Sequence, residues 1–195
     1  LKGYTQDSRP GIFSTRPAPI IVNYLGFPGT MASPHHDYLI ADKRVIPEHQ
    51  QPWYSEKIIY LPGCYQPNSR ITNLSAYELS RTAAGLPESG FVFCSFNQLA
   101  KLTPSVFALW MKILLVVEHS VLWLLVPNLT AQNNLLREAA GFGVSPDRLV
   151  FAKALPVTEH LQRLQLADLM LDSYPCGAHT TCSDALRMGV PVVTR

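Results

Sequence analysis

The sequence predicts an α/β fold built on parallel strands, and three observations support this class. Short apolar segments alternate with segments of helical periodicity over most of the chain. From residue 90 onward the alternation is regular, with five predicted strands separated by four predicted helices, which is the order found in half of a doubly wound sheet. Hydrophobic residues make up 47% of the 195 residues, enough for the cores of one or two domains.

The first domain is predicted over residues 1–86, where most of the sixteen prolines lie. We expect its opening segment, residues 1–18, to be irregular because it is rich in turn-forming residues. β-branched runs then indicate buried strands, and polar stretches between them indicate loops or short helices. In chain order the sequence predicts strands at 20–25, 37–42 and 58–61, a loop or short helix at 47–54, a polar linker at 66–74 and a short helix at 77–84.

The second domain is predicted over residues 87–195. Thr103 followed by Pro104 is typical of a helix start, because threonine accepts from free backbone N–H groups and proline fits the first turn. Thr158 is expected to cap a later helix. Gly141 and Gly143 indicate a helix end rather than a nucleotide loop, because no strand directly precedes them and no third glycine follows. The predicted strands are 91–96, 121–126, 147–151, 169–171 and 190–194, and the predicted helices are 103–117, 130–140, 158–167 and 180–188.

Composition argues against two classes of partner. Charged residues make up 15% of the chain and the net charge is +2, so no basic stripe for nucleic acid is expected. Residues 106–126 are apolar enough to suggest a membrane span, but Lys112 and Glu118 interrupt them. Each central charge costs about 2.5–3.5 kcal/mol on insertion. We therefore predict a helix, a turn and a buried strand there, and no membrane association.

The cysteines and histidines suggest neither disulfides nor metal. The four cysteines show no Cys-x-x-Cys spacing and no signal peptide precedes them, so we expect free thiols in a reducing compartment and a cytoplasmic protein. His35, His36 and Asp37 are adjacent, but no second cluster of ligand residues accompanies them, and we expect no metal.

The strongest functional signal lies in residues 169–194. An apolar strand is broken by Pro175 and Gly177, and Thr180 and Thr181 follow where the next helix is expected to begin. A helix N-terminus directly after a strand offers N–H donors and a positive dipole end to phosphate, and ligands bind at this edge of open parallel sheets. Hydroxyl residues at such a position are otherwise simple helix caps. Both interpretations remain open on these residues alone.

Several blocks of the sequence resemble the O-GlcNAc transferase family, also called SPINDLY-like. The blocks are Leu-Gly-Phe-Pro-Gly-Thr at 25–30, Tyr-Ser-Glu-Lys at 54–57, Phe-Asn-Gln-Leu-Ala-Lys at 96–101, Gly-Ala-His-Thr-Thr at 177–181, Asp-Ala-Leu at 184–186 and Gly-Val-Pro-Val-Val-Thr at 189–194. The resemblance covers nearly the whole chain. It implies a GT-B-type fold with two Rossmann-like lobes and parallel sheets, of which the first lobe is incomplete in this fragment.

The resemblance also implies roles for single residues. Lys101 would neutralise the diphosphate that leaves during sugar transfer, which makes it the one catalytic candidate in this chain. The implied donor-binding residues are Gln98, Lys101, His160, His179, Thr180, Thr181 and Asp184, and the implied sugar pocket comprises Leu25, Gly26, Pro28 and Cys176. Asp184 suits ribose, since carboxylates accept hydrogen bonds from vicinal hydroxyls. Arg163 is a weaker phosphate candidate. Ala100 stands where the family often has an aromatic residue, and Val157 stands where the animal enzymes have a lysine.

The implied activity is transfer of a sugar, expected to be N-acetylglucosamine, from a UDP-sugar to Ser or Thr of proteins. No Asp-x-Asp motif is present, so fixed donors rather than a metal are expected to stabilise the leaving diphosphate, and no cofactor is expected beyond the donor substrate. The implied partners are a protein acceptor and upstream helical repeats of the TPR type. The general base is expected outside this chain, so the fragment alone is expected to be inactive. A non-catalytic UDP-sugar-binding module, or a transferase with another sugar or acceptor, remains an alternative.

Overall fold

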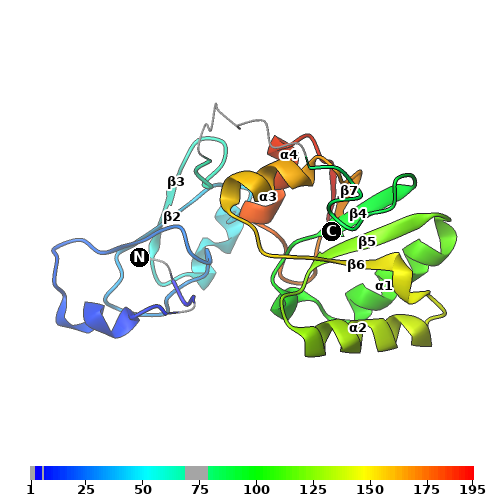
Figure 1. Ribbon diagram of the computed structural model, residues 1–195. Helices are drawn as coiled ribbons and strands as arrows, with labels where there is room; N and C mark the ends of the chain where they lie inside the picture. Colours follow the sequence, from blue (N-terminus) through cyan, green and yellow to red (C-terminus); the bar gives the residue numbers. More distant parts are fainter. Residues whose placement is uncertain (1–2, 6, 69–78) are drawn as a thin grey trace. The chain divides into compact units, whose positions relative to one another are not determined.

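A computed structural model of the chain describes residues 3–5, 7–68 and 79–195. The chain divides into two compact units, residues 1–69 and 70–195, and each is described by itself (Figure 1). Most of the predicted linker at 66–74 lies outside the described residues, as does the start of the predicted helix at 77–84. In the described part of that helix, residues 81–85 form a turn instead.

The division between the units falls earlier than the predicted boundary at residue 86. The reason is that residues 81–86 pack on the second unit. Leu86 is buried in the same core as Val92. The guanidinium of Arg81 pairs with Asp168 at 3.1 Å and donates to the Gly90 carbonyl at 2.8 Å. These contacts tie the segment before the first strand of the second unit to that unit's own sheet.

The first unit is a three-stranded parallel sheet in the order β1-β2-β3. Leu39, Ala41 and Ile46 form its buried core. The three predicted strands are confirmed, as is the short helical segment within 47–54. The prediction of an irregular 1–18 is wrong in one part, because a 3-10 helix forms there. The elements are η1 (Pro10–Thr15), β1 (Val22–Asn23), β2 (Tyr38–Ala41), η2 (Glu48–Trp53) and β3 (Lys57–Tyr60).

The second unit is a five-stranded, fully parallel sheet in the order β6-β5-β4-β7-β8. Its strands are β4 (Phe91–Ser95), β5 (Ser120–Leu125), β6 (Leu149–Ala152), β7 (Leu169–Leu171) and β8 (Val192–Val193). The chain runs outward from β4 to β6 and then returns to the other side of β4. The strand order therefore reverses between β4 and β7, and the crevice at the carboxyl ends of such a strand pair is where open α/β sheets bind ligands.

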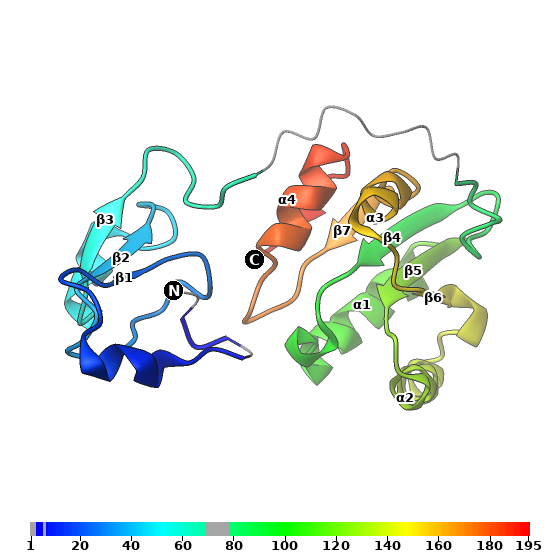
Figure 2. The ribbon, with the colours of Figure 1, turned by 60° about the vertical axis from the view of Figure 1, so that its left-hand side comes forward.

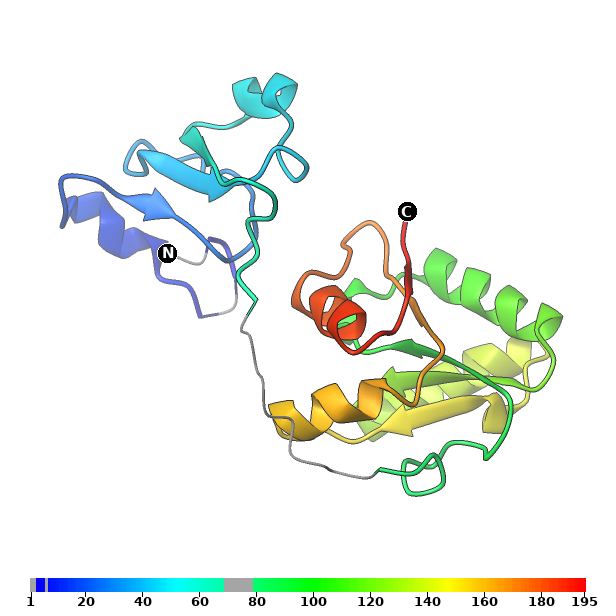
Figure 3. The same cartoon turned by 90° about the horizontal axis from the view of Figure 1, so that it is seen from above.

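Helices cover both faces of this sheet (Figures 1 and 2). The helical elements are η3 (Leu99–Lys101), α1 (Pro104–Val116), α2 (Leu129–Gly141), η4 (Pro146–Arg148), α3 (Val157–Leu164) and α4 (Thr180–Arg187). Side chains alternate between the faces along each strand. Cys94 and Trp123 join the core under α3 and α4, while Phe93 and Leu122 join the core under α1 and α2. Figure 3 shows α3 and the sheet from above.

The ends of the helices test the capping predictions. Thr103 caps α1 as expected, accepting from the Val106 amide at 3.4 Å, and α2 ends at Gly141. Thr158 does not cap α3, because the helix begins one residue earlier and Pro156 is its N-cap. Thr180 and Thr181 do not cap α4 either, since the N-cap is His179, which makes no side-chain cap bond.

Among the described residues, no helix is both long and apolar enough to cross a bilayer.

Candidate functional site

The carboxyl ends of β4 and β7 are joined by side-chain hydrogen bonds. Asn97 follows β4 and Asp172 follows β7. The Asn97 amide nitrogen donates to Asp172 Oδ1 at 3.1 Å and to Ser173 Oγ at 3.0 Å. Its amide oxygen accepts from the hydroxyl of Thr181, in the first turn of α4, at 2.5 Å. One asparagine thus connects both strand ends to the start of a helix.

Asp172 organises the loop that runs from β7 to α4. Its Oδ1 accepts from the backbone amides of Ser173 and Ala178, both at 2.8 Å. Its Oδ2 accepts from the hydroxyl of Thr194, which follows β8, at 2.8 Å. A Cβ added to Gly177 would lie 3.0 Å from Oδ2, so the glycine lets the loop backbone approach the carboxylate closely.

Lys101 lies in η3 and reaches the same loop. Its ammonium nitrogen donates to the carbonyl oxygen of Gly177 at 2.8 Å, and the residue is half-buried. His179, the N-cap of α4, is also half-buried. Burial, and then the neighbouring Lys101 cation, lower the pKa of His179, and the Asp172 carboxylate opposes this shift. A fixed cation, a neutral imidazole and the N-terminal amides of α4 therefore occupy one edge of the sheet, which is a set of groups that suits an anion.

Three further candidates flank this edge. Thr180 is exposed as the first residue of α4. Asp184 lies four residues later and hence on the same side of the helix. Burial raises the pKa of Asp184, although Arg187 opposes the shift. Gln98 is exposed at the start of η3. Cys176 is half-buried in the loop after β7, and its carbonyl accepts from the Ser173 hydroxyl at 2.8 Å.

His160 in α3 reaches the same edge through an aromatic contact. Its ring packs edge-on against Phe96, with centroids 5.4 Å apart, and Phe96 directly precedes Asn97. Arg163 donates to His160 Nδ1 through Nε at 3.0 Å. Because a guanidinium can only donate, Nδ1 must accept and the neutral ring carries its proton on Nε2. Burial and the Arg163 charge accordingly lower the pKa of His160 to about 4.

The structure gives Arg163 a different place from the one expected for a phosphate ligand. The residue is 2% exposed. Its guanidinium lies 4.8 Å from the centroid of the Phe96 ring and donates to the Lys153 carbonyl as well as to His160. Arg163 is therefore enclosed by these partners and does not face solvent.

The three sugar-pocket candidates of the first unit lie in the turn after β1. Leu25 is 42% exposed and has a φ of 59°, a left-handed conformation that is uncommon for a residue of this type. Gly26 and Pro28 are half-buried. The Pro28 carbonyl accepts from the hydroxyl of Tyr54 at 3.2 Å, which holds this turn against the segment before β3.

The sequence prediction found part of this constellation. Hydrogen bonds connect Lys101 to the loop of Cys176 and Gly177, and connect Thr181 to Asn97 at the same edge. His179 lies close enough to Lys101 for the cation to lower its pKa. The prediction missed Asn97 and Asp172 as the residues that join these groups. A signal was present, because each is a polar residue just after a predicted strand, at the edge where ligands bind.

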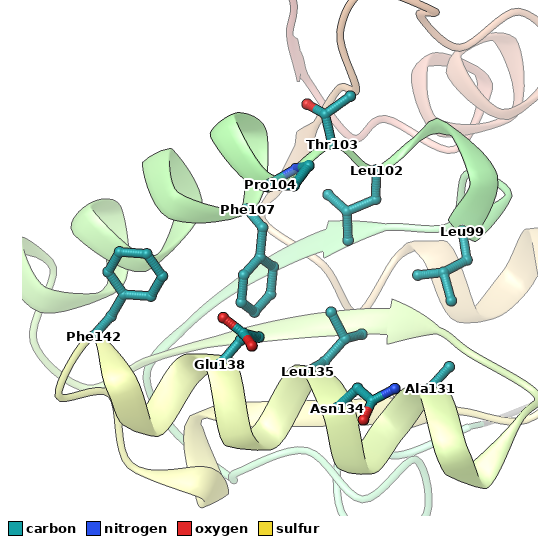
Figure 4. A pocket seen from close by; sticks show the side chains of 10 residues that line it. All are labelled: Leu99, Leu102, Thr103, Pro104, Phe107, Ala131, Asn134, Leu135, Glu138 and Phe142. Atoms are coloured by element: carbon teal, nitrogen blue, oxygen red, sulfur yellow. The ribbon is translucent and has the colours of Figure 1, made fainter.

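A cavity of about 460 Å³ lies elsewhere, between α1 and α2 (Figure 4). Side chains such as Phe107 and Leu135 point into it from the two helices, and Leu99 and Leu102 close one end. None of its lining residues is basic, so the cavity does not suit a diphosphate. Within the described part of the chain, no group of three or more His, Cys, Asp or Glu side chains could hold a metal ion.

A parallel sheet with binding loops at its carboxyl edge is general to doubly wound α/β folds. Solved glycosyltransferase structures confirm the predicted GT-B-type fold class. WaaG, a glycosyltransferase involved in lipopolysaccharide biosynthesis, matches 98% of this chain and 65% of its own with a TM-score of 0.54, and at 17% identity this is a likeness of fold alone. A mutant O-GlcNAc transferase of Thermobaculum terrenum matches 93% of this chain and 34% of its own, with a TM-score of 0.78 and 31% identity.

The chain belongs to glycosyl transferase family 41, whose model matches residues 1–68 and 73–195. It is 40% identical over 200 residues to SEC of Arabidopsis thaliana, which is named a probable UDP-N-acetylglucosamine–peptide N-acetylglucosaminyltransferase; the match covers 100% of this chain and 20% of SEC. It is 25% identical over 305 residues to the UDP-N-acetylglucosamine–peptide N-acetylglucosaminyltransferase of Caenorhabditis elegans, covering 26% of that protein. The chain thus spans about a fifth to a quarter of these relatives.

Proposed function

We propose that this chain forms the donor-binding part of a protein glycosyltransferase that moves N-acetylglucosamine from UDP-N-acetylglucosamine to Ser or Thr. Membership of family 41 supports the reaction class, and the names of the relatives support the donor and the peptide acceptor. The acceptor-binding helical repeats and the general base belong, in this proposal, to other parts of the full protein. We place the reaction in the cytoplasm, which is consistent with the free thiols of all four cysteines.

The observation that carries this proposal is the contact of 2.8 Å between the Lys101 ammonium and the Gly177 carbonyl. It holds a cation beside the N-terminus of α4, where His179, Thr180 and Thr181 lie. When the sugar leaves UDP, negative charge develops on the diphosphate, and fixed donors that face this charge lower the barrier. The proposed mechanism therefore needs no divalent metal and no cofactor.

The other residues take roles that fit their chemistry. Asp184 accepts hydrogen bonds from ribose hydroxyls, and Gln98 contacts the nucleotide from the exposed start of η3. His160 donates through Nε2–H, because its Nδ1 is occupied by Arg163. Cys176, in the loop after β7, is proposed to contact the sugar, and the sugar-contacting roles expected for Leu25, Gly26 and Pro28 stay predictions.

Calorimetry of UDP binding in EDTA tests the proposal. The chain should bind UDP with the same affinity in EDTA and in Mg²⁺, and Lys101→Met should weaken binding by about tenfold or more, as expected for loss of a charge-assisted contact. Lys112→Met on the exposed side of α1 is the matched control and should bind as wild type. Loss of binding on chelation would overturn the fixed-donor mechanism.

Competition and turnover separate the remaining alternatives. UDP-N-acetylglucosamine should displace UDP better than other UDP-sugars do; the reverse order would favour a different sugar. The full-length protein should transfer the sugar to a peptide. Donor binding without any transfer by the full-length protein would favour a non-catalytic binding module.

A further inference from the structure

Asp172 is a carboxylate at an edge of the sheet that otherwise suits an anion. An unpaired carboxylate beside a diphosphate would repel it. The carboxylate oxygens of Asp172, however, accept hydrogen bonds from three segments of the second unit. Asn97 donates from the end of β4, Ser173 and Ala178 from the loop after β7, and Thr194 from the end of β8. A carboxylate that accepts several hydrogen bonds serves as a structural anchor.

The anchored loop carries the groups that would meet the diphosphate. The Ala178 amide donates to Asp172, and its two neighbours in the chain are Gly177 and His179. The Gly177 carbonyl accepts from the Lys101 ammonium, and His179 is the N-cap of α4. Asn97 extends the anchor to the helix itself, because its oxygen accepts from Thr181. Displacement of Asp172 would thus shift the cation and the helix N-terminus relative to each other.

We propose that Asp172, braced by Asn97, is the positioning residue of the anion-binding edge, and that it acts through its hydrogen bonds rather than through its charge. The inference rests on the proposed function for the identity of the anion, a nucleoside diphosphate. The hydrogen-bond pattern makes a distinctive prediction. Asparagine at position 172 keeps an oxygen for Ser173 and Ala178 and can donate to the Thr194 hydroxyl. Alanine at position 172 keeps none of these contacts.

Binding of UDP and of uridine to a set of variants tests the role. Asp172→Ala should weaken the binding of UDP by about tenfold or more, the cost expected when several hydrogen bonds are lost. The affinity for uridine should change by less than about threefold, because uridine lacks the diphosphate. Asp172→Asn should stay within about threefold of wild type for both ligands. Asn97→Ala should behave as Asp172→Ala and serves if the latter fails to fold. Asp147→Ala, an exposed aspartate in η4, is the control.

Amide hydrogen exchange without ligand gives a second, independent measurement. Asp172→Ala should speed exchange at Ser173 and Ala178 by about tenfold or more, and Asp172→Asn should preserve protection. Equal loss of UDP affinity in Asp172→Asn and Asp172→Ala would show that the charge matters and would overturn the proposal. So would unchanged UDP binding in Asp172→Ala. A wild-type chain that binds neither UDP nor uridine would defeat the proposed function, and the exchange rates alone would then decide the positioning role.

Discussion

Acidification should destabilise the second unit through His160, a histidine that the fold keeps uncharged. Burial, and then the Arg163 guanidinium, lower its pKa from 6.5 to about 4. In the unfolded chain the ring keeps its ordinary pKa, so between these two values the unfolded state binds the extra proton. The stability that His160 contributes is therefore fully present above pH 6.5 and is lost as the pH falls toward 4.

The size of the effect follows from the two pKa values. They differ by about 2.5 (6.5 minus 4), and one pKa unit corresponds to about 1.4 kcal/mol, so the full loss is at most about 3 kcal/mol, because solvent screens part of the effect on a half-buried ring. Between pH 7 and pH 4.5 the loss should reach about 2 kcal/mol. Burial also lowers the pKa of His179, which lies in the same unit and acts in the same direction. The contribution of His160 must therefore be measured as a difference from a variant.

Urea unfolding followed by tryptophan fluorescence provides that difference. His160→Gln keeps an acceptor for Arg163 but does not titrate, so on acidification from pH 7 to pH 4.5 wild type should lose about 2 kcal/mol more than the variant. His119→Asn is the control, since His119 is exposed and its φ of 55° is one that asparagine tolerates. This control should follow wild type at both pH values. Parallel pH dependence of wild type and His160→Gln would refute the reasoning.

Three further outcomes are expected. In the full-length protein, Lys101→Ala should lower kcat by about 10²-fold or more, with a smaller change in KM for the UDP-sugar. Asp184→Asn should mainly raise KM, because a ribose contact is the same before and during transfer. Steady-state kinetics that show a normal kcat for Lys101→Ala would remove its catalytic role. Gly177→Ala should weaken UDP binding in calorimetry, since its Cβ would lie 3.0 Å from a carboxylate oxygen, whereas Gly141→Ala, with open space around it, should bind UDP as wild type does. Leu122→Ala should lower the free energy of unfolding by about 2–5 kcal/mol in urea titration, because this core side chain is 0% exposed; a loss below about 1 kcal/mol would contradict its place in the core.

Much of the fold could be predicted because the spacing of apolar residues and the residue types that start or end a helix are local properties of the sequence. Phe91–Ser95 and Ser120–Leu125 are apolar runs of strand length, and Thr103 with Pro104 marks a helix start in two adjacent residues. The start of α3 was misplaced because Thr158 is a better capping residue than Pro156 by type, yet the backbone turns into the helix directly after the proline. Local preference was overridden there by the path of the chain from β6.

The arrangement of the site could be predicted only in part, because contacts between distant segments have no local pattern. The sequence places Asn97 and Asp172 at strand ends, but it does not reveal that the strands are neighbours in the sheet. Only that adjacency brings the two side chains to 3.1 Å. The burial of Arg163 could not be predicted for the same reason, because the aromatic ring of Phe96 and the carbonyl of Lys153 that enclose it come from other segments.

The pairing of His160 with Arg163 has a consequence for how relatives are compared. Arg163 is a charged group inside the protein, and His160 is one of the partners that make its burial tolerable. Selection for a stable fold therefore favours the histidine even in a protein that has stopped transferring sugar. The persistence of this histidine in a family member is thus evidence for an intact core on this face of the sheet, and it should not be counted as evidence for enzymatic activity.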